Sequence, residues 1–188
     1  MTELPTRQRL SAAAARLFAE RGYHGASVRE LAAEVGIDKS SVYAHVAGKE
    51  ELLAEIALSG AAAFHGALDA LPAGAPPLER IRLALRAHLE VVQAQLDVAT
   101  VWLREWRYLS GPARERFAGE RRRYERRIRA LFEEAVAAGE ARADLDPQQA
   151  ALLFLSAANW AYTWLGHEMR VEELADGFWR LLADGIAA

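Results

Sequence analysis

The sequence has no cysteine, only two lysines among its 23 basic residues, and no uninterrupted apolar run of the length that crosses a membrane. The absence of cysteine excludes a disulfide framework, thiolate metal ligands and a cysteine nucleophile. The first ten residues lack the apolar core of a secretion signal, and no run reaches about 18 apolar residues. We therefore expect a soluble cytoplasmic protein with no cofactor and no membrane contact.

The histidines form no recognisable catalytic or metal-binding motif, and the chain has no HExxH, Gly-rich phosphate loop or GxSxG elbow. His88 lies in an apolar helix and is interpreted as a core histidine, with a place in a ligand pocket as the alternative. The pair His167 and Glu168 is interpreted as a partner of a helix dipole. We predict no enzyme activity, no catalytic residues and no metal site. The other histidines are His24, His45 and His65.

Residues 27–49, SVRELAAEVGIDKSSVYAHVAGK, predict two short helices joined by a tight turn. Ser27 and Glu30 have the spacing of a capping box, in which the serine hydroxyl and the glutamate carboxylate each accept from a backbone N–H. Gly36 can end the first helix in the left-handed conformation. Asp38 is a favourable N-cap for the second. This is the layout of a helix-turn-helix.

The second short helix has small polar and ring side chains where an interior helix would have leucine. Such side chains reach phosphates and base edges when a helix lies in the major groove. The two lysines begin this helix and the next, where an ammonium group beside free N–H groups can meet phosphate. A purely structural helical pair is the alternative. We predict contacts with double-stranded operator DNA for Ser27, Arg29, Lys39, Ser40, Ser41, Tyr43, His45 and Lys49.

Charge is unevenly distributed along the chain, whose net charge is −3. Residues 1–50 have a balance of +1, residues 104–129 a balance of +6, and the remainder a balance of −10. Affinity for DNA would therefore depend on local placement of charge and on dimer symmetry more than on a global field.

Helical periodicity continues nearly to the end of the chain, and no segment alternates as a strand does. We predict an all-α fold of about nine helices, with a three-helix helix-turn-helix domain followed by a larger helical bundle. Proline and glycine mark the breaks, most densely in LPAGAPP at residues 71–77. Besides the two short helices, the predicted helices span residues 8–25, 49–70, 78–96, 97–109, 112–138, 147–166 and 171–186.

The segment LFAERGYHGASVRELAAEVGIDKSSVYAHVAGKEELL resembles the N-terminal domain of the TetR/AcrR family of one-component repressors, and the resemblance covers about the first 55 residues. It implies a DNA-binding domain over residues 1–48 and a ligand-binding and dimerisation domain over residues 49–188. Ala44, Val46 and Gly48 depart from the usual family pattern. Ala44 leaves the preferred DNA sequence open.

Residues 150–165, AALLFLSAANWAYTWL, are apolar around nearly the whole helix circumference. One side can face its own bundle, and a two-fold symmetric dimer would cover the other with the last two helices of each chain. A central buried helix of a monomer is the alternative. We assign the homodimer interface to Leu152, Leu155, Phe178, Trp179 and Leu182.

A polar line of Ser156, Asn159 and Thr163 runs along this apolar helix, and either hydrogen-bonds across the dimer interface or lines a cavity. Arginines at the density of residues 104–129 usually form a solvated face. Beside tryptophans, they also suit a partly apolar ligand that carries phosphates. The predicted ligand-binding residues are Trp102, Trp106, Arg107, Tyr124, Asn159, Trp160, Thr163 and Trp164.

Residues 105–139, EWRYLSGPARERFAGERRRYERRIRALFEEAVAAG, resemble TetR-family members that sense coenzyme A thioesters. The predicted function is that of a homodimeric repressor released from operator DNA by an acyl-CoA, another CoA thioester or a fatty-acid-like effector. A repressor of an efflux pump that responds to drug-like hydrophobic ligands is the alternative, and it would favour carboxylates in the pocket. An architectural DNA binder without an effector would lack a cavity.

Overall fold

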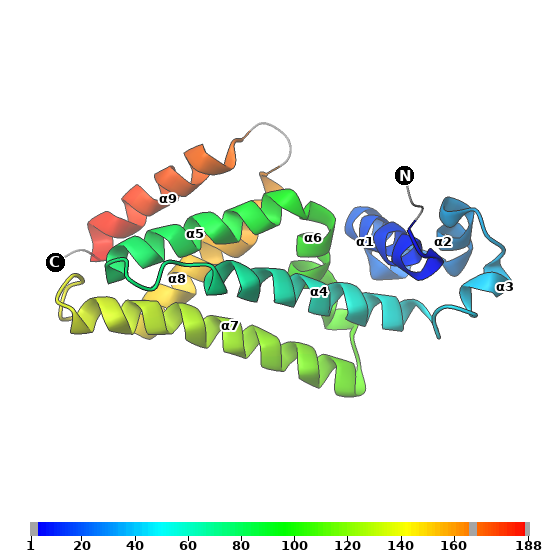
Figure 1. The fold of residues 1–188 in the computed structure, drawn as a ribbon, viewed down its shortest axis with the longest axis horizontal. Helices are drawn as coiled ribbons and strands as arrows, with labels where there is room; N and C mark the ends of the chain where they lie inside the picture. Colours follow the sequence, from blue (N-terminus) through cyan, green and yellow to red (C-terminus); the bar gives the residue numbers. More distant parts are fainter. Residues whose placement is uncertain (1–3, 166–168, 187–188) are drawn as a thin grey trace. The chain divides into compact units, whose positions relative to one another are not determined.

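The computed structural model describes residues 4–165 and 169–186, and all regular elements in that part of the chain are helical (Figure 1). The pair His167 and Glu168 lies outside the described residues. Two short 3-10 helices and nine α-helices are present in the described residues, which confirms the predicted all-α fold. The α-helices are α1 (Thr6–Gly25), α2 (Val28–Val35), α3 (Lys39–Val42), α4 (Lys49–Asp69), α5 (Pro77–Ala94), α6 (Leu96–Arg104), α7 (Gly111–Ala137), α8 (Pro147–Trp160) and α9 (Val171–Ile186).

Two of the predicted helices continue as 3-10 turns. The helix expected over residues 97–109 is divided into α6 and the 3-10 helix η1 (Glu105–Tyr108). The helix expected over residues 147–166 gives way after α8 to the 3-10 helix η2 (Ala161–Thr163). Thr163 donates its hydroxyl to the carbonyl of Trp160 at 2.8 Å, which satisfies a terminal carbonyl of α8 in this tighter turn.

The predicted helix boundaries coincide with the local signals that indicated them. Asp146 caps α8, since its side chain accepts from the N–H groups of Gln148 at 2.8 Å and Gln149 at 3.3 Å. Pro147 follows in the first turn, where its missing N–H is not needed. The chain leaves α7 through Gly139, whose φ of 72° is favourable for glycine.

The chain forms two compact units. The first comprises residues 1–61 and 97–118, and the second comprises residues 62–96 and 119–188. The first unit thus contains the beginning of α4, most of α6 and η1 in addition to α1–α3. These units are interleaved along the chain, and the domain boundary after residue 48 that the resemblance implies stays a prediction.

In the first unit, the core is formed by apolar side chains of α1, α2 and α4, with Trp102 of α6. A Cβ atom at Gly60 of α4 would lie only 3.0 Å from the Cβ of Trp102, so glycine permits α6 to approach α4 closely. The buried side chains of these helices in the first unit include Leu10, Leu17, Phe18, Leu31, Leu52, Leu53 and Ile56.

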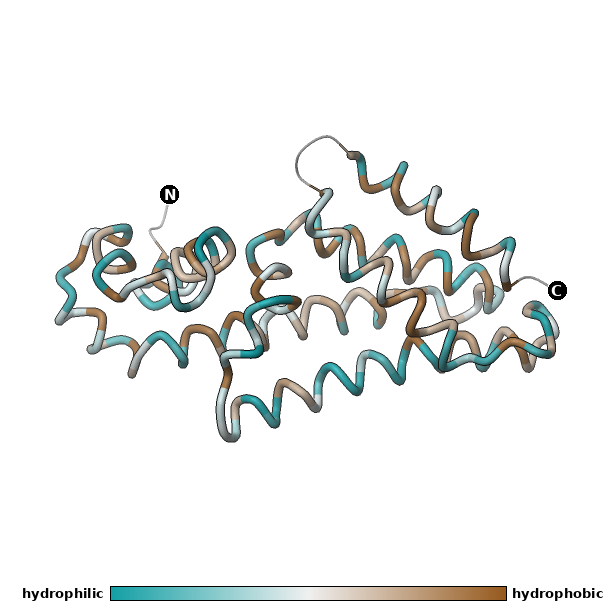
Figure 2. Tube along the Cα trace, turned by 180° about the vertical axis from the view of Figure 1, so that it is seen from behind, coloured by the Kyte–Doolittle hydropathy of each residue, from teal (hydrophilic) through white to brown (hydrophobic). Residues whose placement is uncertain are grey.

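In the second unit, α9 lies along α5, and α8 also packs on α5 (Figure 1). Ile81, Leu85 and Leu89 of α5 are buried, as are Phe132 of α7 and Phe154 of α8. Hydrophilic residues recur along α7, which contains eight arginines (Figure 2). In the described part of the chain, no helix combines the length and apolarity that crossing a membrane requires.

Candidate functional site

The turn between α2 and α3 has the predicted geometry. The Ser27 hydroxyl accepts from the Glu30 N–H at 3.2 Å, and the Glu30 carboxylate accepts from the Ser27 N–H at 2.8 Å. These bonds also hold the pKa of Glu30 below its usual value. Gly36 ends α2 with φ of 75°. Asp38 occupies the N-cap of α3, but its side chain makes no capping hydrogen bond there, contrary to the expectation.

One side of α3 is exposed and polar. Val42, on the opposite side of the helix, is buried in the first unit. The exposed ring of Tyr43 has a relative accessibility of 52%, and Ser41 is half-buried. An exposed polar side of this kind can enter a DNA groove without unfolding the unit. The other exposed residues predicted to contact DNA are Ser27, Arg29, Lys39, Ser40 and His45.

Arg7 of α1 supports this segment, although it was not among the site residues predicted from the sequence. Its guanidinium donates to the carbonyl of His45 at 2.8 Å. It also pairs with Glu51 at 2.6 Å and Glu55 at 3.0 Å, both on α4. These bonds connect α1, the end of the α3 segment and α4. The two glutamates at i and i+4 were the available sequence signal for a cation partner.

Lys49 at the start of α4 is bonded to the segment that joins α1 to α2. Its Nζ donates to the carbonyls of Tyr23 at 2.7 Å and Ala26 at 2.5 Å, and lies 4.5 Å from the centre of the Tyr23 ring. Partial burial lowers the pKa of its ammonium group. Two carbonyls and an aromatic ring already satisfy this cation, so its geometry favours a structural role over the phosphate contact expected from its position.

Three of the predicted ligand-binding residues lie in the first unit. Trp102 is buried and Trp106 is half-buried, and both rings pack on Phe117, with centroid distances of 6.2 Å and 5.7 Å. Arg114 lies over the Trp106 ring at 6.0 Å. The exposed Arg107 donates to the carbonyl of Arg104 at 2.7 Å. The two tryptophans therefore contribute to an aromatic cluster within this unit.

Tyr124 lies in the core of the second unit and is paired with His88. The Tyr124 hydroxyl and His88 Nδ1 are 3.0 Å apart, and both side chains are buried. Burial lowers the pKa of His88 to about 3 and raises that of Tyr124, because it penalises the charged form of each. His88 is thus a neutral core histidine, as interpreted from the sequence.

Acid is expected to destabilise the protein through His88. Its pKa is about 3 when folded and 6.5 when unfolded, so the unfolded chain binds the proton first as the pH falls. Between about pH 7.5 and about pH 5.5, this linkage removes about 1 kcal/mol from the free energy of unfolding. In urea titrations, His88→Phe should lose this part of the pH dependence, and His45→Gln, at an exposed site, should retain it. An unchanged slope in His88→Phe would contradict the assignment.

Most of the polar line on α8 is satisfied within its own helix. The Ser156 hydroxyl donates to the carbonyl of Leu152 at 2.7 Å, and Thr163 donates to Trp160 as described. Asn159 differs, because its buried Oδ1 has no hydrogen-bond partner among the described residues. Trp160 is exposed. Trp164 is exposed as well, and its ring edge meets Phe178 at a centroid distance of 6.2 Å.

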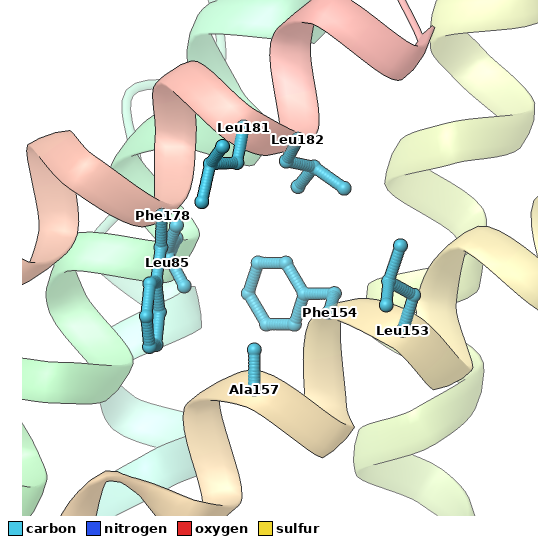
Figure 3. A pocket seen from close by; sticks show the side chains of 7 residues that line it. All are labelled: Leu85, Leu153, Phe154, Ala157, Phe178, Leu181 and Leu182. Carbon is cyan, nitrogen blue, oxygen red and sulfur yellow. The ribbon is translucent and has the colours of Figure 1, made fainter.

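The second unit has an apolar groove of about 220 Å³ between α5, α8 and α9 (Figure 3). Leu181 and Leu182 of α9 face Phe154 and Ala157 of α8 in this view. Leu153 and Leu181 at its edge have relative accessibilities of 61% and 77%. Neither leucine is among the five residues assigned to the dimer interface from the sequence. Those five range from exposed Leu152, through half-buried Leu155, Phe178 and Trp179, to buried Leu182.

Comparison with known families accounts for both parts of the chain. Residues 10–56 match the model of bacterial regulatory proteins of the tetR family. Residues 74–186 match the model of the tetracyclin repressor-like C-terminal domain. The chain belongs to the TetR family. This family consists of DNA-binding transcriptional regulators, which confirms the predicted family and the prediction that the protein is not an enzyme.

Individual TetR-family relatives are similar over most of the chain. The HTH-type transcriptional repressor KstR2 of Mycobacterium tuberculosis is 30% identical over 136 residues, which are 71% of this chain and 68% of KstR2. The structure of AibR in complex with isovaleryl coenzyme A and operator DNA has a TM-score of 0.86 at 29% identity, covering 94% of this chain and 97% of AibR. PfmR from Thermus thermophilus has a TM-score of 0.85 at 31% identity, covering 93% of this chain and 96% of PfmR.

Proposed function

We propose that this TetR-family regulator is a homodimeric repressor that binds operator DNA through α2 and α3 and leaves it when a coenzyme A thioester binds. The exposed polar side of α3, with Lys39, Ser40 and Tyr43 above a buried Val42, carries the DNA-binding part of the proposal. One such helix reads only a few base pairs, so two copies are needed for an operator with two half-sites.

The apolar groove supports the homodimer. Leu152, Leu153 and Leu181 are exposed on α8 and α9, and the groove between these helices is lined by carbon. Removing apolar surface of this kind from water is favourable and would stabilise the association of two chains. A second copy presents the same helices, so a two-fold axis would pair each apolar face with its equivalent.

The effector class is supported by the relatives and by the composition of α7. AibR has been crystallised with isovaleryl coenzyme A and operator DNA, and it is similar to this chain over nearly its whole length. Exposed guanidinium groups of Arg122, Arg123 and Arg126 are suited to phosphate, which coenzyme A carries. Aromatic and aliphatic side chains of the second unit suit the acyl part. A fatty-acid-like ligand would use the same apolar surroundings without the phosphates.

We expect acyl-CoA esters to bind and to lower operator affinity. A sequence selected from random duplexes by the protein would serve as the operator, and isovaleryl-CoA and longer esters would be titrated by calorimetry. A preference of about 3 kcal/mol for the DNA-free form lowers DNA affinity more than about 100-fold. Free coenzyme A, free acids and hydrophobic cationic drugs are the comparison ligands.

Each outcome of this titration has a distinct meaning. Release by thioesters alone supports the proposed effector, and release by free acids points to a fatty-acid-like ligand. Release only by cationic drugs would favour the efflux-pump alternative. Selective operator binding without heat from any member of the panel would remove the thioester proposal and leave the DNA-binding proposal in place.

A further inference from the structure

Helix α1 is bent at Gly22, four residues before the chain reaches the α2 region at Ala26. The backbone of Gly22 has φ of 75° and ψ of 161°, far from helical values and readily adopted only by glycine. In a continuous α-helix the Tyr23 N–H would donate to the Ala19 carbonyl. The bend separates the helical segments that contain these two groups, so each needs another partner.

An ion pair from η1 and the end of α6 supplies both partners. The Glu105 carboxylate accepts from the Tyr23 N–H at 2.7 Å. The Arg104 guanidinium donates to the Ala19 carbonyl at 2.7 Å, and its Nε is 2.6 Å from the Glu105 carboxylate. The ion pair therefore replaces one missing helical hydrogen bond. It bridges the Tyr23 N–H, which is bound by the Glu105 carboxylate, and the Ala19 carbonyl, which is bound by the Arg104 guanidinium.

The Glu105 carboxylate is buried close to the bend. Glu105 has a relative accessibility of only 4%, in a region where an unpaired carboxylate would be costly. A Cβ atom at Gly22 would lie 3.6 Å from its Oε2, so the carboxylate closely approaches the bend. Tyr108 of η1 also stacks on Tyr23 at a centroid distance of 5.7 Å.

The bent segment leads directly to the DNA-binding helices. Ala26 is followed by Ser27, the N-cap of α2, and Lys49 holds the carbonyls of Tyr23 and Ala26 against α4. The direction in which the chain leaves Gly22 therefore sets where α2 begins.

We propose that Arg104 and Glu105 are positioning residues for operator binding, which they serve by holding α1 bent at Gly22 without touching DNA. The proposal rests on the proposed function, since it concerns affinity for operator DNA. Without the ion pair, the Ala19 carbonyl and the Tyr23 N–H can pair with each other, because glycine also accepts helical angles. The straightened α1 would redirect the chain that enters α2.

Glu105→Ala and Gly22→Ala are expected to weaken operator binding by the same route. Each should lower affinity about tenfold or more, the effect of one charge-assisted hydrogen bond. The slope of affinity against salt should stay as in the wild type, because no phosphate contact is removed. The double variant should be no weaker than the weaker single variant, since both changes straighten the same bend. Glu105→Gln keeps an oxygen for Tyr23 and should show a smaller loss.

The matched control is Glu115→Ala, which removes an exposed carboxylate from α7 in the same unit. It should bind operator as the wild type does. Backbone chemical shifts of Gly22 provide a readout independent of DNA, because Glu105→Ala should move its φ and ψ from 75° and 161° toward helical values. Wild-type affinity in Glu105→Ala, additive losses in the double variant, or unchanged Gly22 shifts would overturn the inference. Absence of operator binding by the wild type would instead remove the proposed function, with the Gly22 shifts still deciding the role of the ion pair.

Discussion

The double substitution Leu153→Glu and Leu181→Glu is expected to convert the dimer into monomers. Both leucines are largely exposed at the edge of the apolar groove, so the isolated chain tolerates glutamate there. In the proposed dimer, four leucines lose burial worth about 2 kcal/mol each, and four carboxylates are placed against apolar surface. We expect the dissociation constant to rise about 1000-fold or more, as measured by sedimentation equilibrium.

The control for this experiment is Leu4→Glu, which changes an exposed leucine outside α8 and α9. It should sediment as the wild type does. Operator binding should fall together with dimerisation in the double variant, because the two half-sites would then be bound independently. A double variant that remained dimeric would place the interface elsewhere and would contradict the assignment of α8 and α9.

Lys39→Ala and Lys49→Ala are expected to weaken operator binding in different ways. The exposed Lys39 is available to a phosphate, and each dimer has two copies. Its loss should lower the slope of log affinity against log salt by about 1.8, or about 0.9 per phosphate. Lys49 is already bonded to the carbonyls of Tyr23 and Ala26. Its loss should lower thermal stability and leave the salt slope almost unchanged.

Two substitutions that could affect base contacts, and that do not change the charge, serve as the comparison for the two lysine variants. Tyr43→Phe and Ser41→Ala remove groups from the α3 segment without changing charge, so they should alter the order of preferred operators more than the salt slope. Equal losses on all operators from both would contradict base contacts by these residues. If both Lys39→Ala and Lys49→Ala lowered the salt slope equally, the result would support the phosphate contact that the sequence predicted for Lys49.

The parts of the fold that follow from local signals could be predicted from the sequence. The capping box of Ser27 and Glu30, the left-handed Gly36 and the Asp146 cap each join residues only a few positions apart. Helical periodicity supplied the remaining helices, and proline and glycine supplied their ends. These signals also predicted the exposed side of α3, because its polar composition is incompatible with burial.

The parts that depend on distant contacts could not be predicted. Nothing near Lys49 in sequence shows that its ammonium group meets carbonyls 23 and 26 residues earlier. The apolar circumference of residues 150–165 likewise does not tell which side faces solvent, so exposed Leu153 was not assigned to the interface. On α9, buried Leu182 was assigned to it and exposed Leu181 was not. Glu105 was expected inside a regular helix because its partner, the Tyr23 N–H, lies 82 residues away.

This separation has a consequence for the order in which the molecule folds. The capping bonds of α2 close a loop of only three residues, whereas the bond from Tyr23 to Glu105 must close a loop of 82. Short loops close sooner and at a smaller entropic cost. During synthesis, α1 to α3 emerge well before η1 and can form through their own neighbouring contacts. A nascent chain that has not yet reached Glu105 would therefore have a formed helix-turn-helix of α2 and α3, preceded by an α1 that still lacks its bend at Gly22.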